Sequence, residues 1–339
     1  MPLTLSLSRL ALGQNLTTDE TREAFDAIFE GKAPAEQIAS FLVSLKDKGE
    51  TVEEILGAVT SMRSRMIAVQ APAGAMDIVG TGGDAHSTLN ISTAAAMVVA
   101  ACGVPVAKHG NRAASSRSGS SDVLAALGIN LDATKETLER CLKEANLCFM
   151  FAPRHHPAMR HVAEIRKQLK TRTIFNLLGP LTNPAGVKHH LIGVFARDWL
   201  EPMAKVLNQL GSETAWLTHG QDGMDEITTT APTDVVTLRG GNIDRMILEP
   251  EHVGLARVRL EVLKGGEAEH NAAELKRLLQ GQRGTYRDIV QFNAGAALIV
   301  AGKTNDLREG MTLAERAIDT GAARKLLEKL IAITNGRNI

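Results

Sequence analysis

The spacing of hydrophobic and polar positions predicts three amphipathic helices near the start of the chain, over residues 16–31, 34–50 and 51–66. In each segment apolar residues recur every three or four positions, so that they line one face of a helix. The last segment opens on Thr51 with Glu54 three residues later, which is the sequence signature of a capping box. The pattern indicates a set of short helices joined by short links.

After a Pro- and Gly-containing stretch at residues 71–75, the pattern changes to short apolar runs that alternate with helical segments. Strands are predicted over residues 76–80, 104–110, 190–195 and 213–220. Helices are predicted over residues 92–103, 120–128, 200–211, 271–282, 288–302 and 321–334. This alternation favours an α/β fold with a central, mostly parallel sheet flanked by helices. We therefore expect a small N-terminal helical domain over residues 1–70 and a larger α/β domain over residues 71–339, a division that suits a chain of 339 residues.

Composition narrows the class of protein. The formal net charge is zero and no run of Lys or Arg stands out, which argues against a nucleic-acid or membrane partner. One Tyr and two Trp provide little surface for stacking bases. Three cysteines without a CxxC pair indicate small buried side chains in a reducing compartment. Neither a signal peptide nor an apolar span of about 20 residues is present, so we expect a cytoplasmic protein.

The first stretch with candidate chemistry is the turn "GTGGDA", which follows the predicted strand 76–80. Ligands of α/β sheets bind beyond the carboxyl ends of the strands, and glycine lets backbone N–H groups approach an anion closely. The turn also matches the dinucleotide pattern GxGxxA. Against that interpretation, no helix begins at once, Lys108 occupies the region where a ribose-binding acid is expected, and Asp84 disfavours a pyrophosphate unless it holds a cation or a ribose hydroxyl. A Walker A motif does not occur.

Two further polar clusters border predicted helices. Asn90, Ser92 and Thr93 fit the start of helix 92–103, where free N–H groups attract phosphate, although simple capping would explain one of them. After strand 104–110 comes a loop that is either a second anion-binding loop or a solvated surface loop. Its donors are Lys108, Arg112, Ser115, Ser116, Ser118 and Ser120.

The distant segments add acids and one arginine. Asp225 and Glu226 are adjacent acids that follow the predicted strand 213–220. Such hard oxygen ligands suit Mg²⁺ that is shared with substrate phosphates. An isolated pair of acids is more commonly surface charge, so its context decides. Arg166 suits recognition of a planar carboxylate, with surface exposure as the alternative.

Together, the motifs resemble the anthranilate phosphoribosyltransferase family over nearly the whole chain. They are "GTGGD", "NIST", "KHGNR", "SSRSGSSDVLAALG", "HHPAM", "RTIFNLLGPLTNPAG", "DGMDEI" and "FNAGAAL". The resemblance implies Mg²⁺-dependent transfer of a phosphoribosyl group from 5-phosphoribosyl 1-pyrophosphate to the amine of anthranilate, in tryptophan biosynthesis. It also implies a site in the cleft between the domains, helices near 160–185 packed onto the helical domain, and a homodimer formed through that domain.

By this resemblance the site residues fall into four groups. The donor would contact Gly80, Gly83, Asp84, Thr88, Asn90, Ile91, Ser92, Thr93, Lys108, His109, Gly110, Asn111, Arg112, Ala113, Ala114, Ser115, Ser116 and Ser120. Anthranilate would contact Gly80, Asn111, His156 and Arg166, and Mg²⁺ would be held by Ser92, Asp225 and Glu226. Lys108 and His109 are the candidate catalytic residues. One departure is Lys170, where relatives usually carry Gly.

The resemblance also implies the mechanism and its rivals. Breaking the bond between C1 and pyrophosphate builds positive charge on the ribose and negative charge on the leaving group, which a metal ion, Lys108 and helix N-termini would stabilise. We expect no covalent enzyme intermediate. A pyrimidine nucleoside phosphorylase would not need the acids Asp225 and Glu226. A non-catalytic, nucleic-acid-binding relative would show a basic face, which zero net charge disfavours.

Overall fold

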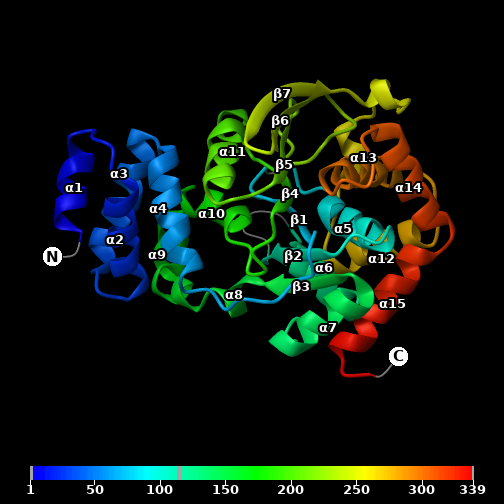
Figure 1. Ribbon diagram of the computed structural model, residues 1–339, viewed down its shortest axis with the longest axis horizontal. Helices are drawn as coiled ribbons and strands as arrows, with labels where there is room; N and C mark the ends of the chain where they lie inside the picture. Colours follow the sequence, from blue (N-terminus) through cyan, green and yellow to red (C-terminus); the bar gives the residue numbers. More distant parts are fainter. Residues whose placement is uncertain (1–2, 85, 113–116, 338–339) are drawn as a thin grey trace.

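The computed structural model describes residues 3–84, 86–112 and 117–337. Its N-terminal part is a block of four helices, seen at the left of Figure 1: α1 (Thr4–Ala11), α2 (Thr18–Phe29), α3 (Ala35–Lys48) and α4 (Val52–Arg63). The predicted capping box at Thr51 and Glu54 is confirmed, and a second one, formed by Thr17 and Glu20, begins α2. In each box the threonine side chain accepts a hydrogen bond from the backbone N–H three residues later. One of the N–H groups that lack a partner at the start of the helix is thereby satisfied.

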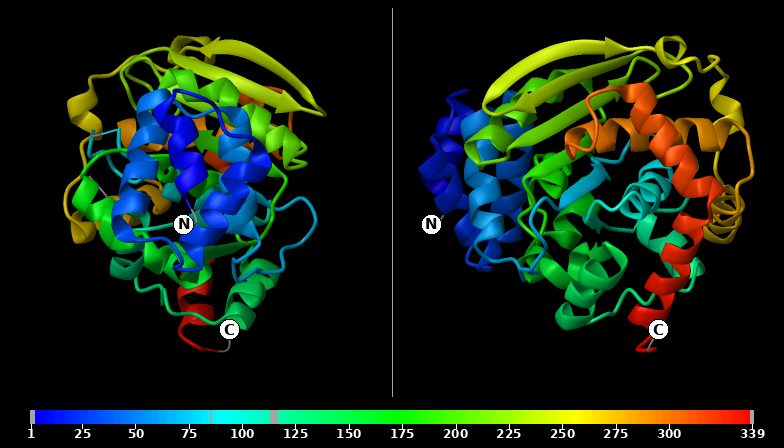
Figure 2. Two further views of the ribbon diagram at one scale, coloured as in Figure 1. Left: turned by 90° about the vertical axis from the view of Figure 1, so that its left-hand side faces the viewer. Right: turned by 45° about the vertical axis from the view of Figure 1, so that its right-hand side comes forward.

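A seven-stranded sheet forms the centre of the rest of the chain. Its strands are β1 (Met76–Gly80), β2 (Val106–Gly110), β3 (Leu147–Phe151), β4 (His189–Gly193), β5 (Thr214–Gly220), β6 (Thr233–Arg239) and β7 (Asn242–Leu248). The spatial order is β3-β2-β1-β4-β5-β6-β7, and the first five are parallel. The last two form an antiparallel hairpin that arches over the top of the molecule (Figure 2). The predicted mostly parallel sheet is thus confirmed.

Helices cover both faces of the sheet. Those on the side of the C-terminus are α5 (Ile91–Ala101), α6 (Ser120–Ala126), α7 (Lys135–Ala145), α12 (Ala268–Leu279), α13 (Thr285–Val300), α14 (Leu307–Asp319) and α15 (Ala322–Thr334). Toward the N-terminal block lie α8 (Ala152–His155), α9 (Ala163–Leu169), α10 (Phe175–Leu181) and α11 (Leu200–Gln209). Short 3-10 turns occur at Pro157–His161, Arg197–Trp199, Pro250–Val253 and Leu260–Leu263. The α5 helix is buried almost all round, as its run of Ala and Val predicts.

The N-terminal block is not an isolated unit. Its core is continuous with α9 and α10, where the rings of Phe25 and Phe175 meet edge to face with centroids 5.7 Å apart. The same apolar cluster includes Ile192 of β4 and Leu217 of β5, so the block also shares its core with one face of the sheet. Residues of α9 and α10 thus pack against the N-terminal helices. Among the described residues, every helix falls short of the length and apolarity that a membrane span requires.

Candidate active site

The ends of β1 and β4 lie side by side and end in glycines at the level of Asp225. Gly80 and Gly193 are paired across the two strands. A Cβ on Gly80 would stand 2.6 Å from Asp225 Oδ2, and a Cβ on Gly193 would stand 1.4 Å from the carbonyl oxygen of Asp225. At Gly193, glycine is therefore needed to let the backbone of the turn that carries Asp225 pass so closely, whereas at Gly80 it leaves room for the Asp225 carboxylate. The sequence analysis found Gly80 but not Gly193.

The turn formed by residues 222–230, called the acid turn below, joins the two predicted anion-binding elements. Asp225 Oδ2 accepts a hydrogen bond from the backbone N–H of Gly82 at 2.7 Å, and Glu226 Oε1 accepts from the N–H of Ser92 at 3.0 Å. Burial, together with the charge of Asp84, raises the pKa of Asp225 to about 7. Burial likewise raises the pKa of Glu226 to about 8, with Asp225 adding to the effect. Carboxylates from two distant segments thus meet at one place, at an electrostatic cost.

This donor set fits a hard divalent cation. Within residues 3–84, 86–112 and 117–337, no group of three or more His, Cys, Asp or Glu side chains forms a complete metal cluster. Yet Asp84, Asp225 and Glu226 crowd one another enough to raise the pKa of Asp225 and of Glu226, and a bound cation would relieve that repulsion. Mg²⁺ usually takes one or two carboxylates and completes its shell with water and substrate phosphate. The residues present match that incomplete protein shell.

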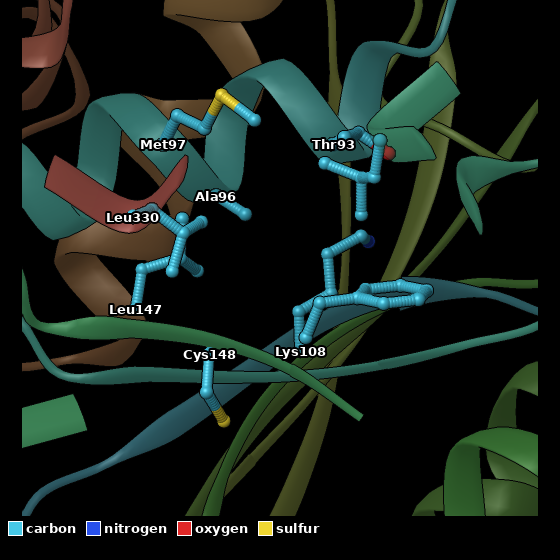
Figure 3. Close-up of a pocket in the computed structure, with 9 residues that line it drawn as sticks. Thr93, Ala96, Met97, Lys108, Leu147, Cys148 and Leu330 are labelled. Carbon is cyan, nitrogen blue, oxygen red and sulfur yellow. The ribbon is translucent and has the colours of Figure 1, made fainter. Parts of the chain in front are cut away.

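Lys108 lies in β2 beneath the acid turn. Its side chain is 3% exposed; Nζ donates to the carbonyl oxygen of Ile78 and, at 3.4 Å, to Ser92 Oγ. Figure 3 shows the side chain extending from its strand toward Thr93, which also lines a small void of about 10 Å³. Burial lowers the pKa of Lys108, while Asp77, Glu226 and Asp225 oppose that change. The void has room for one water at most.

Asp77 is a functional neighbour that the sequence analysis missed. It is fully buried; Oδ1 accepts from the N–H of His109 at 3.2 Å and Oδ2 from Asn183 Nδ2 at 2.7 Å. Burial raises its pKa to about 6, although Lys108 lowers it. Asp77 thus provides the nearby negative charge that a buried ammonium group requires. The signal was present, since an acid inside the apolar strand "MDIVG" is rarely buried without a partner.

Two histidines form a neutral pair on the other side of β2. The ring centroids of His109 and His156 are 5.0 Å apart. Burial lowers the pKa of His109 to about 3 and that of His156 to about 4, so both are neutral near pH 7. His109 Nδ1 lies 3.1 Å from the carbonyl oxygen of Gly179, which can only accept, so Nδ1 carries the proton. The bare Nε2 of His109 is buried and has no hydrogen-bond partner among the described residues.

Arg166 projects from α9 and packs against α10. Its guanidinium lies over the ring of Phe175, 5.2 Å from the centroid, and burial lowers its pKa. In the described part of the chain it forms no ion pair and no hydrogen bond to Asn111 or His156. The structure therefore leaves the predicted carboxylate-binding cation without a carboxylate of the protein's own.

The other predicted residues line the same region or lie outside the described residues. Asn90 does not cap α5; its Oδ1 accepts from Asn271 Nδ2 at 2.9 Å. Thr88 pairs with Lys264 in an isolated bridge, and Ile91 is buried in the core. Gly110, Asn111, Arg112 and Ser120 form one corner, in which Ser120 Oγ donates to the Asn111 carbonyl at 3.4 Å and the Arg112 N–H donates to Asn111 Oδ1 at 2.8 Å. Ala113, Ala114, Ser115 and Ser116 lie outside the described residues.

A cavity and an arginine beside the glycine turn were also not predicted. The cavity, of about 370 Å³, is lined by His86, Ser87, Arg117, Leu260, Lys264 and Gly265, and its three basic side chains suit an anionic ligand. Arg172 donates to the carbonyl oxygen of Gly83 and stacks on Phe195 at 4.5 Å, so it ties the loop between α9 and α10 to the glycine turn.

Comparison with known proteins adds an independent finding. Residues 72–324 match the family model described as glycosyl transferase family, a/b domain, and residues 6–66 match the helical bundle domain of that family. An anthranilate phosphoribosyltransferase from Methylocella silvestris is 57% identical, covering 97% of this chain and 94% of that protein. One from Rhodopseudomonas palustris strain BisA53 is 54% identical, covering 97% of each.

Solved structures agree with these relatives. The crystal structure of anthranilate phosphoribosyltransferase from Thermus thermophilus superposes with a TM-score of 0.92 at 43% identity, covering 98% of this chain and 99% of that one. The Saccharomyces cerevisiae enzyme in complex with PRPP and Mg superposes with a TM-score of 0.91 at 27% identity, covering 98% and 97%. A further structure of the yeast enzyme is a complex with 4-fluoroanthranilate.

Proposed function

Because the chain belongs to the anthranilate phosphoribosyltransferase family, we propose that it transfers the phosphoribosyl group of 5-phosphoribosyl 1-pyrophosphate to the amine of anthranilate, giving N-(5-phosphoribosyl)anthranilate and pyrophosphate in tryptophan biosynthesis. The observation that carries this conclusion is the acid turn. Glu226 and Asp225 are hydrogen-bonded to the start of α5 and to the glycine turn, directly above Lys108. Phosphate, a divalent cation and a buried ammonium group can meet at this place.

The proposed donor site combines three sources of positive potential. The N-terminus of α5 carries a partial positive charge, and such termini bind phosphate; the N–H of Ser92 there donates to Glu226 Oε1. Lys108 adds a full charge from below, and the basic cavity beside His86 and Lys264 adds potential at the entrance. These features support the donor contacts inferred from the sequence, from Gly80 to Ser120.

The enzyme requires Mg²⁺, and Asp225, Glu226 and Ser92 are the residues that we propose hold it. When bound, the ion supplies positive charge that stabilises the pyrophosphate leaving group. The chain's own contribution is to keep these oxygens together before any ligand arrives, through the N–H groups of Gly82 and Ser92. An arrangement fixed in advance needs no reorganisation when charge develops.

On the acceptor side we propose that Arg166 pairs with the anthranilate carboxylate, with Gly80, Asn111 and His156 lining the site. An unpaired, partly desolvated guanidinium is suited to a planar carboxylate. The bare Nε2 of His109 can accept a hydrogen bond from the amine and so orient its lone pair toward C1. With a pKa of about 3, His109 remains an uncharged acceptor and not a strong base.

The proposed mechanism is positioning plus charge stabilisation. As the bond from C1 to pyrophosphate breaks, Lys108 and the N-terminus of α5 face the growing negative charge of the leaving group. The amine then attacks C1 directly, so no covalent enzyme intermediate forms. Holding the two reactants together converts a bimolecular step into an effectively unimolecular one.

Three broader assignments complete the proposal. We propose a division into a helical domain, residues 1–70 joined by helices near 160–185, and an α/β domain over 71–339. We also propose a homodimer formed through the helical domain, which the exposed Leu5 of α1 and Leu12 directly after it, 70% and 74% accessible, support. The enzyme would act in the cytoplasm, with small-molecule substrates and no nucleic-acid or membrane partner.

The direct test follows anthranilate fluorescence against time with 5-phosphoribosyl 1-pyrophosphate, in Mg²⁺ or in EDTA. Loss of fluorescence that requires Mg²⁺ is the expected result. Folded protein that leaves the signal unchanged would refute the transferase, and phosphorolysis of pyrimidine nucleosides and then nucleic-acid binding would be tested next.

A further inference from the structure

Asn293 of α13 holds the backbone immediately next to Glu226. The N–H of Ile227 donates to Asn293 Oδ1 at 3.1 Å, and Asn293 Nδ2 donates back to the carbonyl oxygen of Ile227 at 2.7 Å. The same Nδ2 also donates to the carbonyl of Ile289 at 2.9 Å. One side chain thus satisfies both polar groups of a single peptide residue from 66 positions away in sequence.

Burial makes this contact hard to replace. Asn293 is 1% exposed and Ile227 is fully buried, so water cannot take over the hydrogen bonds. Leaving a buried N–H or C=O without a partner costs about 1–3 kcal/mol. Only a side chain with one acceptor and a two-proton donor matches the pair, and Asn is the residue that provides both at this length.

Hydrogen bonds within the acid turn also make it a rigid unit. Asp222 Oδ1 accepts from the N–H of Met224 at 3.0 Å, and its Oδ2 accepts from the hydroxyls of Thr228, at 2.8 Å, and Thr230. A rigid turn moves as one body, so the place where it is anchored to the rest of the fold fixes both carboxylates. Asn293 anchors it one residue from Glu226.

We propose that Asn293 is a positioning residue for cation binding: through the backbone of Ile227 it sets the place of Glu226 and Asp225 relative to Ser92 and Gly82. It touches neither substrate nor reacting atoms. The inference rests on the proposed function to the extent that the acid turn holds the divalent cation. Groups that orient metal ligands typically change metal affinity by about 10–100-fold when removed.

The test measures Mn²⁺ binding by electron paramagnetic resonance, with Mn²⁺ alone and with Mn²⁺ plus inorganic pyrophosphate. The variants are Asn293→Asp, which keeps the shape but loses the two-proton donor, and Asn293→Ser, in case the first does not fold. We expect the Kd for Mn²⁺ to rise about tenfold or more in both. In steady-state assays, kcat should recover partly at high Mg²⁺ while the KM for anthranilate stays unchanged.

Thr334→Val is the matched control. Thr334 is a buried polar residue of α15, 6% exposed, and accepts from the N–H of Asn130 at 3.3 Å. Its loss should lower stability without changing the Kd for Mn²⁺. An Asn293→Asp protein that binds Mn²⁺ as the parent does would overturn the inference alone. A parent protein that binds no Mn²⁺ would overturn both the inference and the proposed metal site, and a parent inactive in the fluorescence assay despite binding Mn²⁺ would refute only the proposed reaction.

Discussion

The donor side and the acceptor side of the candidate site differ in the charges that they bury. On the donor side, burial raises the pKa of Asp225 and Glu226 and lowers that of Lys108, so charges of both signs are crowded together. On the acceptor side, burial lowers the pKa of His156 and of Arg166, which leaves neutral rings and a guanidinium without an ion-pair partner among the described residues. The donor side is therefore completed by a cation with its phosphates, and the acceptor side by a single carboxylate. Substitutions on the two sides should have different kinetic signatures.

The largest expected effect is on the donor side and is steric. In Gly193→Ala the new Cβ would stand 1.4 Å from the carbonyl oxygen of Asp225, so β4 or the acid turn must move. Overpacking of this kind costs about 1–3 kcal/mol of stability. Displacing preorganised charged groups lowers kcat by about 10²–10³-fold. Urea unfolding and the fluorescence assay measure the two effects.

Gly179→Ala is the folding control for this substitution. A Cβ on Gly179, in α10, meets no atom within 4 Å, so the stability should match that of the parent. If Gly193→Ala kept the parent's kcat, the close passage of the acid turn over β4 would not matter for turnover.

The next effect belongs to the acceptor side. In Arg166→Ala the anthranilate carboxylate loses its proposed partner, and a hydrogen bond to a charged group is worth about 1.5–3 kcal/mol, or roughly 10–100-fold in KM. We expect the KM for anthranilate to rise by that factor while the apparent Mg²⁺ requirement stays the same. Arg166→Lys should recover only part of the loss, because Lys cannot make a bidentate pair.

Glu226→Gln provides the contrasting pattern on the donor side: the Mg²⁺ requirement should rise while the KM for anthranilate stays near the parent value. Initial rates over a grid of Mg²⁺ and anthranilate concentrations would separate the two patterns. If both variants shifted the same constant, the division of the site into two independent sides would be wrong.

Features of the two sides that neighbouring residues specify could be predicted from the sequence. Features that depend on contacts between segments far apart in the chain could not. The capping box at Thr51, the glycine turn and the Asp–Glu pair are local signals that could be predicted from the sequence, and the alternation of elements predicted the mostly parallel sheet. The roles of Asp77, Gly193 and Asn293 arise only when distant segments meet. No pattern among neighbouring residues indicates that Gly193 in β4 faces the backbone of Asp225, 32 residues later.

The strands that the sequence analysis missed have a similar explanation. β3 is the short apolar run "LCFMF", which periodicity alone cannot assign. β6 and β7 turn back on each other through Gly240 and Gly241, both with positive φ. They add antiparallel pairing to a sheet whose earlier strands alternate with helices, so the alternation gave no reason to expect them.

A smaller effect concerns the histidines of the acceptor side and pH. The folded pKa of His156, about 4, lies below its ordinary value near 6.5, so the unfolded chain binds more protons between these values. The contribution of this histidine to the free energy of unfolding is therefore fully present above pH 6.5 and is lost as the pH falls toward 4. Between pH 7 and 5 one such group accounts for about 2 kcal/mol. The loss measured by urea unfolding should be smaller by that amount in His156→Asn, and an equal loss would show that this ring is accessible to protons.

The smallest effect lies at the end of α9, close to Arg166. Lys170 directly follows this helix in the left-handed conformation, with φ of 50°, a conformation that glycine adopts without strain. A non-glycine residue in this conformation lowers the stability by about 1 kcal/mol. Replacing it with glycine removes that strain, but the larger unfolded-state entropy of glycine offsets part of the gain. We expect Lys170→Gly to raise the free energy of unfolding by about 0.5–1 kcal/mol. Because the backbone path is already the one that glycine prefers, Arg166 should not move, and the KM for anthranilate should stay at the parent value. A changed KM with unchanged stability would instead mean that the Lys170 side chain contributes to the acceptor site, and the contrast between the two sides would then include a second cation.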